Sequence, residues 1–271
     1  MSGPARAGGL AYREAGQETD PAVLLVHGYP ESSYMWHSAL PALADAGFRA
    51  LAPDLPGYGD SEPAGVGSGT WERHVEALDR FVRELELGPV ALVTHDWGVP
   101  IGLCWACDHP GVASALVISD GGFFADRRWH DLANVMRTPE EGEKLIRAYT
   151  REGFAAAMHA VSSGMGEDAI EEYWKAFADD TRRLGHLELY RSGDFDKLLP
   201  YDGRVAALGV PALIVWGQQD RFAGVAMAQR FHDELPDSEL VVLDGAGHFV
   251  WDDEPERTSA ALVDFLRRRL R

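Results

Sequence analysis

Asp96 stands at the tip of a turn between a predicted buried strand and a predicted helix. In the run Val90-Ala-Leu-Val-Thr-His-Asp-Trp-Gly98, the apolar residues predict a strand that ends at Thr94, and a helix begins near Val99. A turn this short pushes one side chain above the end of a sheet, where a nucleophile can meet its substrate. Capping of the helix is an equally good interpretation while this run is taken alone.

A histidine and two further aspartates follow other predicted strands. His248 lies in Leu243-Asp-Gly-Ala-Gly-His-Phe249, a glycine-rich turn that would expose the imidazole as a general base. Asp220 closes the run Leu213-Ile-Val-Trp-Gly-Gln-Gln-Asp220 and could orient that imidazole. Nucleophile, acid and histidine then follow one another along the chain. Asp120, after an earlier strand, is the alternative acid.

Backbone N–H groups beside Asp96 could form an oxyanion hole. In Leu24-Leu-Val-His-Gly-Tyr-Pro30 a predicted strand runs into a His-Gly loop. One oxyanion donor in this arrangement comes from that loop and the other from the residue after the nucleophile, which assigns the N–H groups of Tyr29 and Trp97. His27 is interpreted as a structural residue that orients the loop.

An aspartate nucleophile favours substitution at a saturated carbon. Attack on an ester or amide would give an anhydride, whereas attack on saturated carbon gives an ordinary ester and splits one difficult step into two easier ones. In the second step His248 would take a proton from water, which then attacks the ester carbonyl of Asp96. We therefore expect a small apolar substrate, with water as the second reactant.

Short apolar runs alternate with helical stretches along the chain. These runs have four or five residues and most precede Gly or Asp, which is typical of buried parallel strands covered by helices on both faces. They are Val23–Val26, Ala50–Pro53, Val90–Val93, Ala115–Ile118, Ala212–Trp216 and Leu240–Leu243. The alternation predicts an α/β fold with a doubly wound, mostly parallel sheet, whose reacting groups lie beyond the carboxyl ends of the strands.

One region interrupts this alternation. Residues 125–204 contain no buried-strand run and have a helical composition. We predict that they form a helical cap inserted between two strands, and that residues 1–124 and 205–271 form the core domain.

Three motifs outside the predicted cap carry a resemblance to a known family. They are His-Gly-Tyr-Pro-Glu-Ser-Ser-Tyr-Met-Trp (27–36), Asp-Leu-Pro-Gly-Tyr-Gly-Asp-Ser (54–61) and His-Asp-Trp-Gly (95–98). These motifs resemble those of the epoxide hydrolases of the α/β-hydrolase superfamily, and the haloalkane dehalogenases share much of the pattern. The resemblance implies an α/β-hydrolase fold, an aspartate nucleophile, an alkyl-enzyme ester and a water molecule activated by histidine.

The chain departs from the family pattern at the nucleophile turn and at its N-terminal end. Val99 stands where the epoxide hydrolases often have a second glycine. The segment before the first predicted strand is short, so we expect the first strand of the sheet to be missing. We expect His74, His186 and His232, which have helical or polar surroundings in the sequence, to lie at the surface.

The leaving group separates two possible activities. Epoxide hydrolases use two cap tyrosines to hold the epoxide oxygen, and the resemblance assigns Tyr190, in Leu-Tyr-Arg-Ser, and more weakly Tyr149. Ordinary packing inside the cap is the other interpretation of both tyrosines. On this assignment the enzyme is an epoxide hydrolase that yields vicinal diols, which is the activity we favour.

Haloalkane dehalogenase activity, which gives an alcohol and a halide, is the alternative. A halide is held by weak donors such as indole N–H groups, and Trp97 is placed for this role. Some dehalogenases supply the second donor from an asparagine where this chain has Tyr29, so Trp129 or Trp174 would have to replace it.

A ligand-binding protein of the same fold without turnover is a third interpretation, because a fold does not fix a function. The set of Asp96, Asp220 and His248 argues against it.

The charge balance excludes several classes of partner. With 25 Lys and Arg against 43 Asp and Glu, the net charge of −18 disfavours nucleic acid and anionic membranes. No apolar run is long enough to cross a membrane and no secretory signal precedes Gly9, so we expect a cytoplasmic protein. Cys104 and Cys107 are interpreted as buried reduced thiols, and we expect neither a cofactor nor a metal.

Overall fold

An eight-stranded sheet forms the centre of the computed structural model, which describes residues 4–63, 65 and 67–270. The strands lie in the order β1-β2-β4-β3-β5-β6-β7-β8. Their bounds are β1 Ala5–Ala7, β2 Leu10–Ala15, β3 Ala22–Val26, β4 Arg49–Pro53, β5 Val90–His95, β6 Ala113–Ser119, β7 Ala212–Gly217 and β8 Ser238–Leu243. β2 pairs antiparallel with β1 and β4, and all other neighbouring strands are parallel. The predicted mostly parallel sheet is therefore confirmed.

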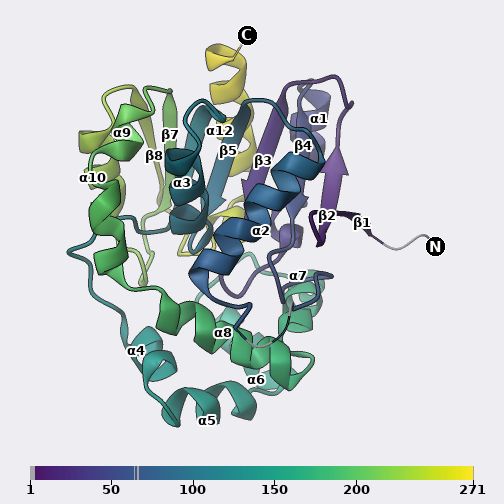
Figure 1. Cartoon of the computed structure of the whole chain (residues 1–271), viewed down its shortest axis with the longest axis vertical. Helices are drawn as coiled ribbons and strands as arrows, with labels where there is room; N and C mark the ends of the chain where they lie inside the picture. Colours follow the sequence, from purple (N-terminus) through teal and green to yellow (C-terminus); the bar gives the residue numbers. More distant parts are fainter. Residues whose placement is uncertain (1–3, 64, 66, 271) are drawn as a thin grey trace.

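Helices cover both faces of this sheet. Those outside the region between β6 and β7 are η1 Ser33–Trp36, α1 Ala39–Asp45, α2 Trp71–Glu84, α3 Gly98–Asp108, α10 Ala226–Glu234, α11 Val250–Asp253 and α12 Pro255–Arg269. Figure 1 shows α2 and α3, which pack together, in front of the sheet and α12 behind it. Because both faces are covered, every residue of β5 and β7 is buried, which explains their unbroken apolar runs.

All six predicted strands are present, but the expectation that the first strand is missing is wrong. Two further strands, β1 and β2, precede β3. β2 is only partly buried and pairs antiparallel at the margin of the sheet, so it mixes Tyr, Arg and Glu with apolar residues and has no continuous apolar run. That is why the sequence pattern missed it.

Helices without any strand fill the chain between β6 and β7. They are α4 Asp131–Arg137, α5 Glu141–Ala148, α6 Arg151–His159, α7 Glu167–Trp174, η2 Lys175–Phe177, α8 Asp180–Ser192, η3 Phe195–Tyr201 and α9 Arg204–Ala207. In Figure 1 helices α4 to α8 lie together beyond one end of the sheet. The segment predicted as a cap is thus helical, while its exact boundaries stay a prediction.

Asp253 joins this helical segment to the end of the core. Its Oδ1 accepts hydrogen bonds from the Ser162 hydroxyl at 2.6 Å and from the backbone N–H groups of Ser163 at 2.8 Å and Gly164 at 3.0 Å. Its Oδ2 accepts from the N–H of Gly247 at 2.8 Å. One carboxylate therefore fixes a loop of the helical segment against the turn that follows β8.

Two predicted surface histidines are in fact buried. His186 lies in α8 with Nδ1 3.0 Å from the Tyr58 hydroxyl and Nε2 2.8 Å from the carbonyl oxygen of Ala176. His74 is also buried, and its ring packs near Tyr58. The expectation failed because each histidine faces the junction between α8 and the core, which local sequence does not reveal. Only His232 is partly exposed.

Cys104 and Cys107 are buried free thiols, as predicted. No helix in the described part of the chain is both long and apolar enough to cross a membrane.

Backbone atoms at the end of β3 and in the loop that follows it pack closely against Gly98 at the start of α3. A Cβ atom on Gly98 would lie 2.3 Å from the carbonyl oxygen of Val26 and 2.8 Å from that of His27. We expect Gly98→Ala to lower the free energy of unfolding by about 1–3 kcal/mol, because backbone atoms must move to admit the methyl group. Urea denaturation measures this change. Gly88→Ala is the control, since nothing lies within 4 Å of its Cβ position; equal losses in the two variants would contradict the prediction.

Candidate active site

Asp96 occupies a sharp turn between β5 and α3. Its φ is +47°, in the left-handed region that a non-glycine residue rarely adopts. The turn is held by hydrogen bonds from the Asp96 N–H to the Ser119 carbonyl at 3.2 Å and from the Val99 N–H to the Asp96 carbonyl at 3.0 Å. Trp97 is the N-cap residue of α3. The Asp96 side chain accepts instead from the Tyr29 N–H at 2.8 Å, so helix capping does not explain this aspartate.

The turn also needs glycines around it. A Cβ on Gly28 would lie 2.5 Å from the Cβ of Asp96, and a Cβ on Gly121 would lie 2.6 Å from the Asp96 carbonyl oxygen. Neighbouring strands must present bare backbone here because the nucleophile turn approaches them so closely.

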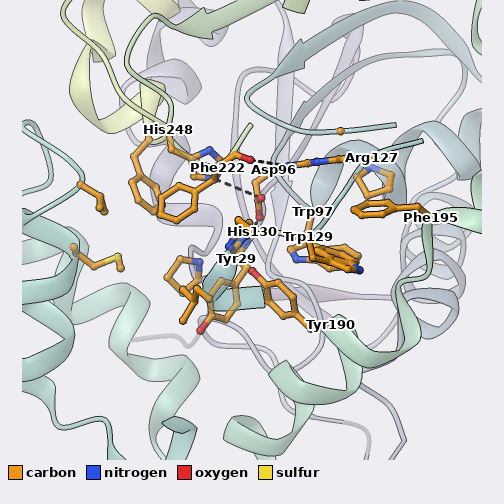
Figure 2. A pocket seen from close by; sticks show the side chains of 17 residues that line it. Tyr29, Asp96, Trp97, Arg127, Trp129, His130, Tyr190, Phe195, Phe222 and His248 are labelled. Carbon is orange, nitrogen blue, oxygen red and sulfur yellow. Dashed lines mark hydrogen bonds and ion pairs between the residues drawn. The ribbon is translucent and has the colours of Figure 1, made fainter. Parts of the chain in front are cut away.

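Three predicted residues meet at the carboxyl ends of β5, β7 and β8. His248 Nε2 lies 3.4 Å from Asp96 Oδ2, and His248 Nδ1 lies 2.9 Å from Asp220 Oδ2 (Figure 2). The other oxygen of Asp220 accepts from the N–H groups of Phe222 at 2.7 Å and Ala223 at 2.9 Å. Asp220 is therefore fixed by the backbone and in turn orients the imidazole.

The charges in this group support one another. Burial raises the pKa of Asp96, but hydrogen bonding and charge attraction from His248, together with the Tyr29 N–H, lower it to about 2. Burial likewise opposes ionisation of Asp220, yet His248 holds the pKa of Asp220 below its usual value. Burial by itself would lower the pKa of His248. The attraction of the two carboxylates is larger than this effect, so the pKa of His248 lies well above its usual value. The unliganded group is an imidazolium between two carboxylates.

The alternative acid, Asp120, does not contact His248. It is fully buried with φ +43°, and its Oδ1 accepts from the Gly217 N–H at 2.9 Å. Its other oxygen, Oδ2, lies 4.0 Å from Nδ1 of His95. Burial and the neighbouring Asp220 raise the pKa of Asp120 well above its usual value, which favours its neutral form.

The predicted oxyanion donors flank the same carboxylate. The Tyr29 N–H donates to Asp96 itself, and Trp97 follows Asp96 directly at the start of α3. His27 is buried, with Nδ1 2.8 Å from the Gly28 carbonyl and Nε2 accepting from the Leu55 N–H at 2.9 Å. These two bonds tie two loops together, in agreement with its structural interpretation.

A cavity opens above Asp96. Its volume is about 70 Å³, and aromatic rings form much of its wall. Figure 2 shows the labelled lining residues Tyr29, Asp96, Trp97, Arg127, Trp129, His130, Tyr190, Phe195, Phe222 and His248. The predicted reactive groups therefore face a mainly apolar pocket.

Only one of the two predicted tyrosines lines this cavity. Tyr190 lies on the inner face of α8, with its ring edge-to-face against Trp97 at 5.3 Å, and its hydroxyl points toward the Asp96 side of the cavity (Figure 2). Burial raises the pKa of Tyr190, whereas its interaction with the Trp97 indole lowers it. Tyr149 is partly exposed, packs against Phe177 at 5.7 Å, and is not among the cavity's lining residues.

His130 is a polar lining residue that sequence reasoning missed. Its Nδ1 accepts a hydrogen bond from the Ala133 N–H at 3.2 Å and so caps α4. Burial lowers the pKa of His130, so the ring is neutral and its proton sits on Nε2. Arg127 was missed as well. Both lie in the loop between β6 and α4, and their place in Arg-Arg-Trp-His after a predicted strand could have drawn attention to them.

The chain is similar to a known protein family and to characterised relatives. A family profile described as alpha/beta hydrolase fold matches residues 21–255. The chain belongs to the alpha/beta hydrolase family. A haloalkane dehalogenase of Mesorhizobium japonicum is 28% identical, over 95% of this chain and 87% of that protein.

Solved structures of alpha/beta hydrolases have the same overall arrangement. A haloalkane dehalogenase from Bradyrhizobium elkani superimposes with a TM-score of 0.81 at 26% identity, covering 95% of this chain and 94% of that one. Epoxide Hydrolase A from Mycobacterium thermoresistibile gives a TM-score of 0.75 at 23% identity, covering 97% of both chains. The second likeness shows the fold alone.

Substitution of Asp220, beside His248, and of Asp120, beside His95, should have very different effects on turnover. Asp220→Asn should lower turnover ~1,000- to 10,000-fold, because the imidazole loses its orientation and its counter-charge. Asp120→Asn should cost only a few-fold, because His248 pairs with Asp220 instead and an amide oxygen can still accept from the Gly217 N–H. Steady-state kinetics of both variants measure this difference. The opposite ranking would assign the acid to Asp120.

Proposed function

We propose that this alpha/beta hydrolase is an epoxide hydrolase that works through an ester on Asp96. The observation that carries the proposal is a pair of neutral donors in the cavity above Asp96, the Tyr190 hydroxyl and the His130 Nε2–H. A strained ring opened by a carboxylate leaves an alkoxide on the substrate, and such donors stabilise that developing charge. His130 thereby takes the place that the sequence had assigned to Tyr149.

In the first step Asp96 displaces the ring oxygen. A new bond forms between a carboxylate oxygen and one epoxide carbon while the bond from that carbon to the ring oxygen breaks. The ring oxygen stays on the substrate, receives hydrogen bonds from Tyr190 and His130, and takes up the proton that His248 releases once Asp96 is esterified. The low pKa of Asp96, about 2, keeps the nucleophile ionised for this attack.

Formation of the ester prepares His248 for the second step. The ester is neutral, so His248 loses the carboxylate at 3.4 Å while it keeps Asp220 at 2.9 Å. Loss of one negative neighbour lowers the pKa of His248 and releases its proton, which makes the imidazole a base. His248 then takes a proton from water, and the hydroxide attacks the ester carbonyl carbon beside the Tyr29 and Trp97 N–H groups. The diol leaves and Asp96 is restored.

Haloalkane dehalogenase activity is the second candidate. It is favoured by the Mesorhizobium relative and by two indoles in the cavity wall, Trp97 and Trp129, whose rings stack at 5.7 Å. Trp174 packs on Phe177 instead and does not line the cavity. The interaction of the Trp97 indole with the Tyr190 hydroxyl supports the epoxide proposal, since the indole then assists a phenol rather than a halide. A ligand-binding protein without turnover would not need the charged group around His248.

Removal of the base should trap the intermediate. His248→Gln should still form the ester and then stall, because the imidazole acts only in the second step. Intact mass spectrometry of the variant with styrene oxide should show one added substrate mass. The native enzyme, after many turnovers in ¹⁸O-water, should carry the label in a peptide that contains Asp96. A variant that stays unmodified but still hydrolyses epoxide would contradict the mechanism.

The cavity tyrosine should distinguish the two reactions. Tyr190→Phe should reduce epoxide turnover ~100- to 1,000-fold, the usual cost of losing one oxyanion donor, and should affect halide release less. Tyr149→Phe is the matched control and should change little. Diol formation and halide release are measured for both variants and for Trp97→Phe. Loss of halide release in Trp97→Phe, with epoxide turnover intact in Tyr190→Phe, would assign a dehalogenase.

A further inference from the structure

Arg127 brings an unpaired cation to the cavity. Its guanidinium lines the cavity, and its Nη2 donates to the Phe222 carbonyl oxygen at 2.9 Å (Figure 2). A guanidinium has five N–H donors. Within the described part of the chain, no carboxylate lies within ion-pair distance of Arg127, whereas Arg182, also largely buried, pairs with Glu62 and Asp179.

The surroundings hold this side chain in place. A Cβ on Gly122 would lie 2.0 Å from Arg127 Nη1, so a glycine is needed there to admit the guanidinium. The guanidinium carbon lies 5.7 Å from the centre of the Phe195 ring, a cation–π contact. Arg127 is therefore built into the wall rather than extended into solvent.

The two carboxylates at the cavity, Asp96 and Asp220, lie beside His248 and not within ion-pair distance of Arg127. Asp96 faces His248, and His248 also faces Asp220. His130 is neutral because burial lowers its pKa. Arg127 is thus the one lining cation without a carboxylate partner among the described residues, and a partly buried cation in this state costs free energy that an anionic ligand would recover.

We propose that Arg127 binds the carboxylate of the substrate, so that the enzyme acts on small epoxy acids. This inference rests on the proposed function and names its substrate class. A carboxylate matches the planar guanidinium with two parallel hydrogen bonds. Its charge must be neutralised before it can lie beside a carbon that another carboxylate, Asp96, attacks, because like charges at such distances repel. Arg127 supplies that neutralisation.

The volume of the cavity agrees with a small acid. The cavity volume of about 70 Å³ exceeds the roughly 10–15 Å³ that a single water molecule needs and is small for an organic substrate. Oxirane-2-carboxylate, with three ring atoms and three carboxylate atoms, matches this size. Its hydrolysis adds one water: Asp96 forms the ester, the C–O ring bond breaks, and the product is a dihydroxy acid.

Binding of ring analogues that cannot react tests Arg127 independently of the reaction. Cyclopropanecarboxylate has the size of the epoxy acid, and cyclopropanecarboxamide is its uncharged counterpart. By titration calorimetry the wild-type enzyme should bind the carboxylate about 10- to 100-fold more tightly than the amide, the range for a charge-assisted hydrogen bond. Arg127→Gln should remove this difference, Arg127→Lys should keep part of it, and Arg128→Gln, at the exposed neighbouring residue, should leave it unchanged.

Kinetics with oxirane-2-carboxylate and oxirane-2-carboxamide complete the test. Arg127→Gln should lower kcat/KM for the acid by about 10- to 100-fold, mainly through KM, and leave the amide within a few-fold. Equal binding of both analogues by the wild type, or equal losses on both substrates, would overturn the carboxylate site and make Arg127 a counter-charge for the aspartates. Arg127-dependent binding of the carboxylate without any epoxide turnover would instead keep the site and overturn the proposed reaction.

Discussion

The left-handed backbone at Asp96 is the constraint on which the whole site depends. β5 is fully buried between β3 and β6, so the strand cannot shift, and its last residue leads directly into a residue with φ +47°. That conformation turns the carboxylate away from α3 and toward the Tyr29 N–H and His248. The conformation is kept because Gly28 and Gly121 let neighbouring backbone close around it.

Burial then decides the charge of every acid and base near that turn. Burial raises the pKa of Asp120, whereas the pKa values of Asp96 and Asp220 stay low because His248 lies between them. The same two carboxylates raise the pKa of His248 well above its usual value. In the proposed reaction, the first chemical step itself changes the imidazole from an acid into a base, and no movement of the chain is needed.

The two parts of the chain contribute different chemistry. The ends of β5, β7 and β8 carry Asp96, Asp220 and His248, which would serve any reaction through an alkyl ester. The segment after β6 carries Arg127, His130 and Tyr190, which contact the substrate and its leaving oxygen in the proposed reaction. The fold alone therefore does not fix the substrate, which depends on the side chains that line the cavity.

The sequence by itself determined the parts that rest on local patterns. Buried parallel strands need continuous apolar runs, and sharp turns at their ends need glycine or small polar residues, so six strands and the positions of Asp96, Asp220 and His248 could be predicted. β2 was missed because a marginal antiparallel strand has no such run.

Only the tertiary structure decided which side chains meet. The choice between Asp220 and Asp120 depends on which strand end lies nearer His248. The choice between Tyr149 and His130 depends on which helix end lies at the cavity, the end of α5 or the start of α4. Arg127 is unpaired because no helix, strand or loop in the described part of the chain brings a carboxylate within ion-pair distance of it. A contact between distant segments is set by the packing of whole helices and strands, and no residue pattern within one segment records it.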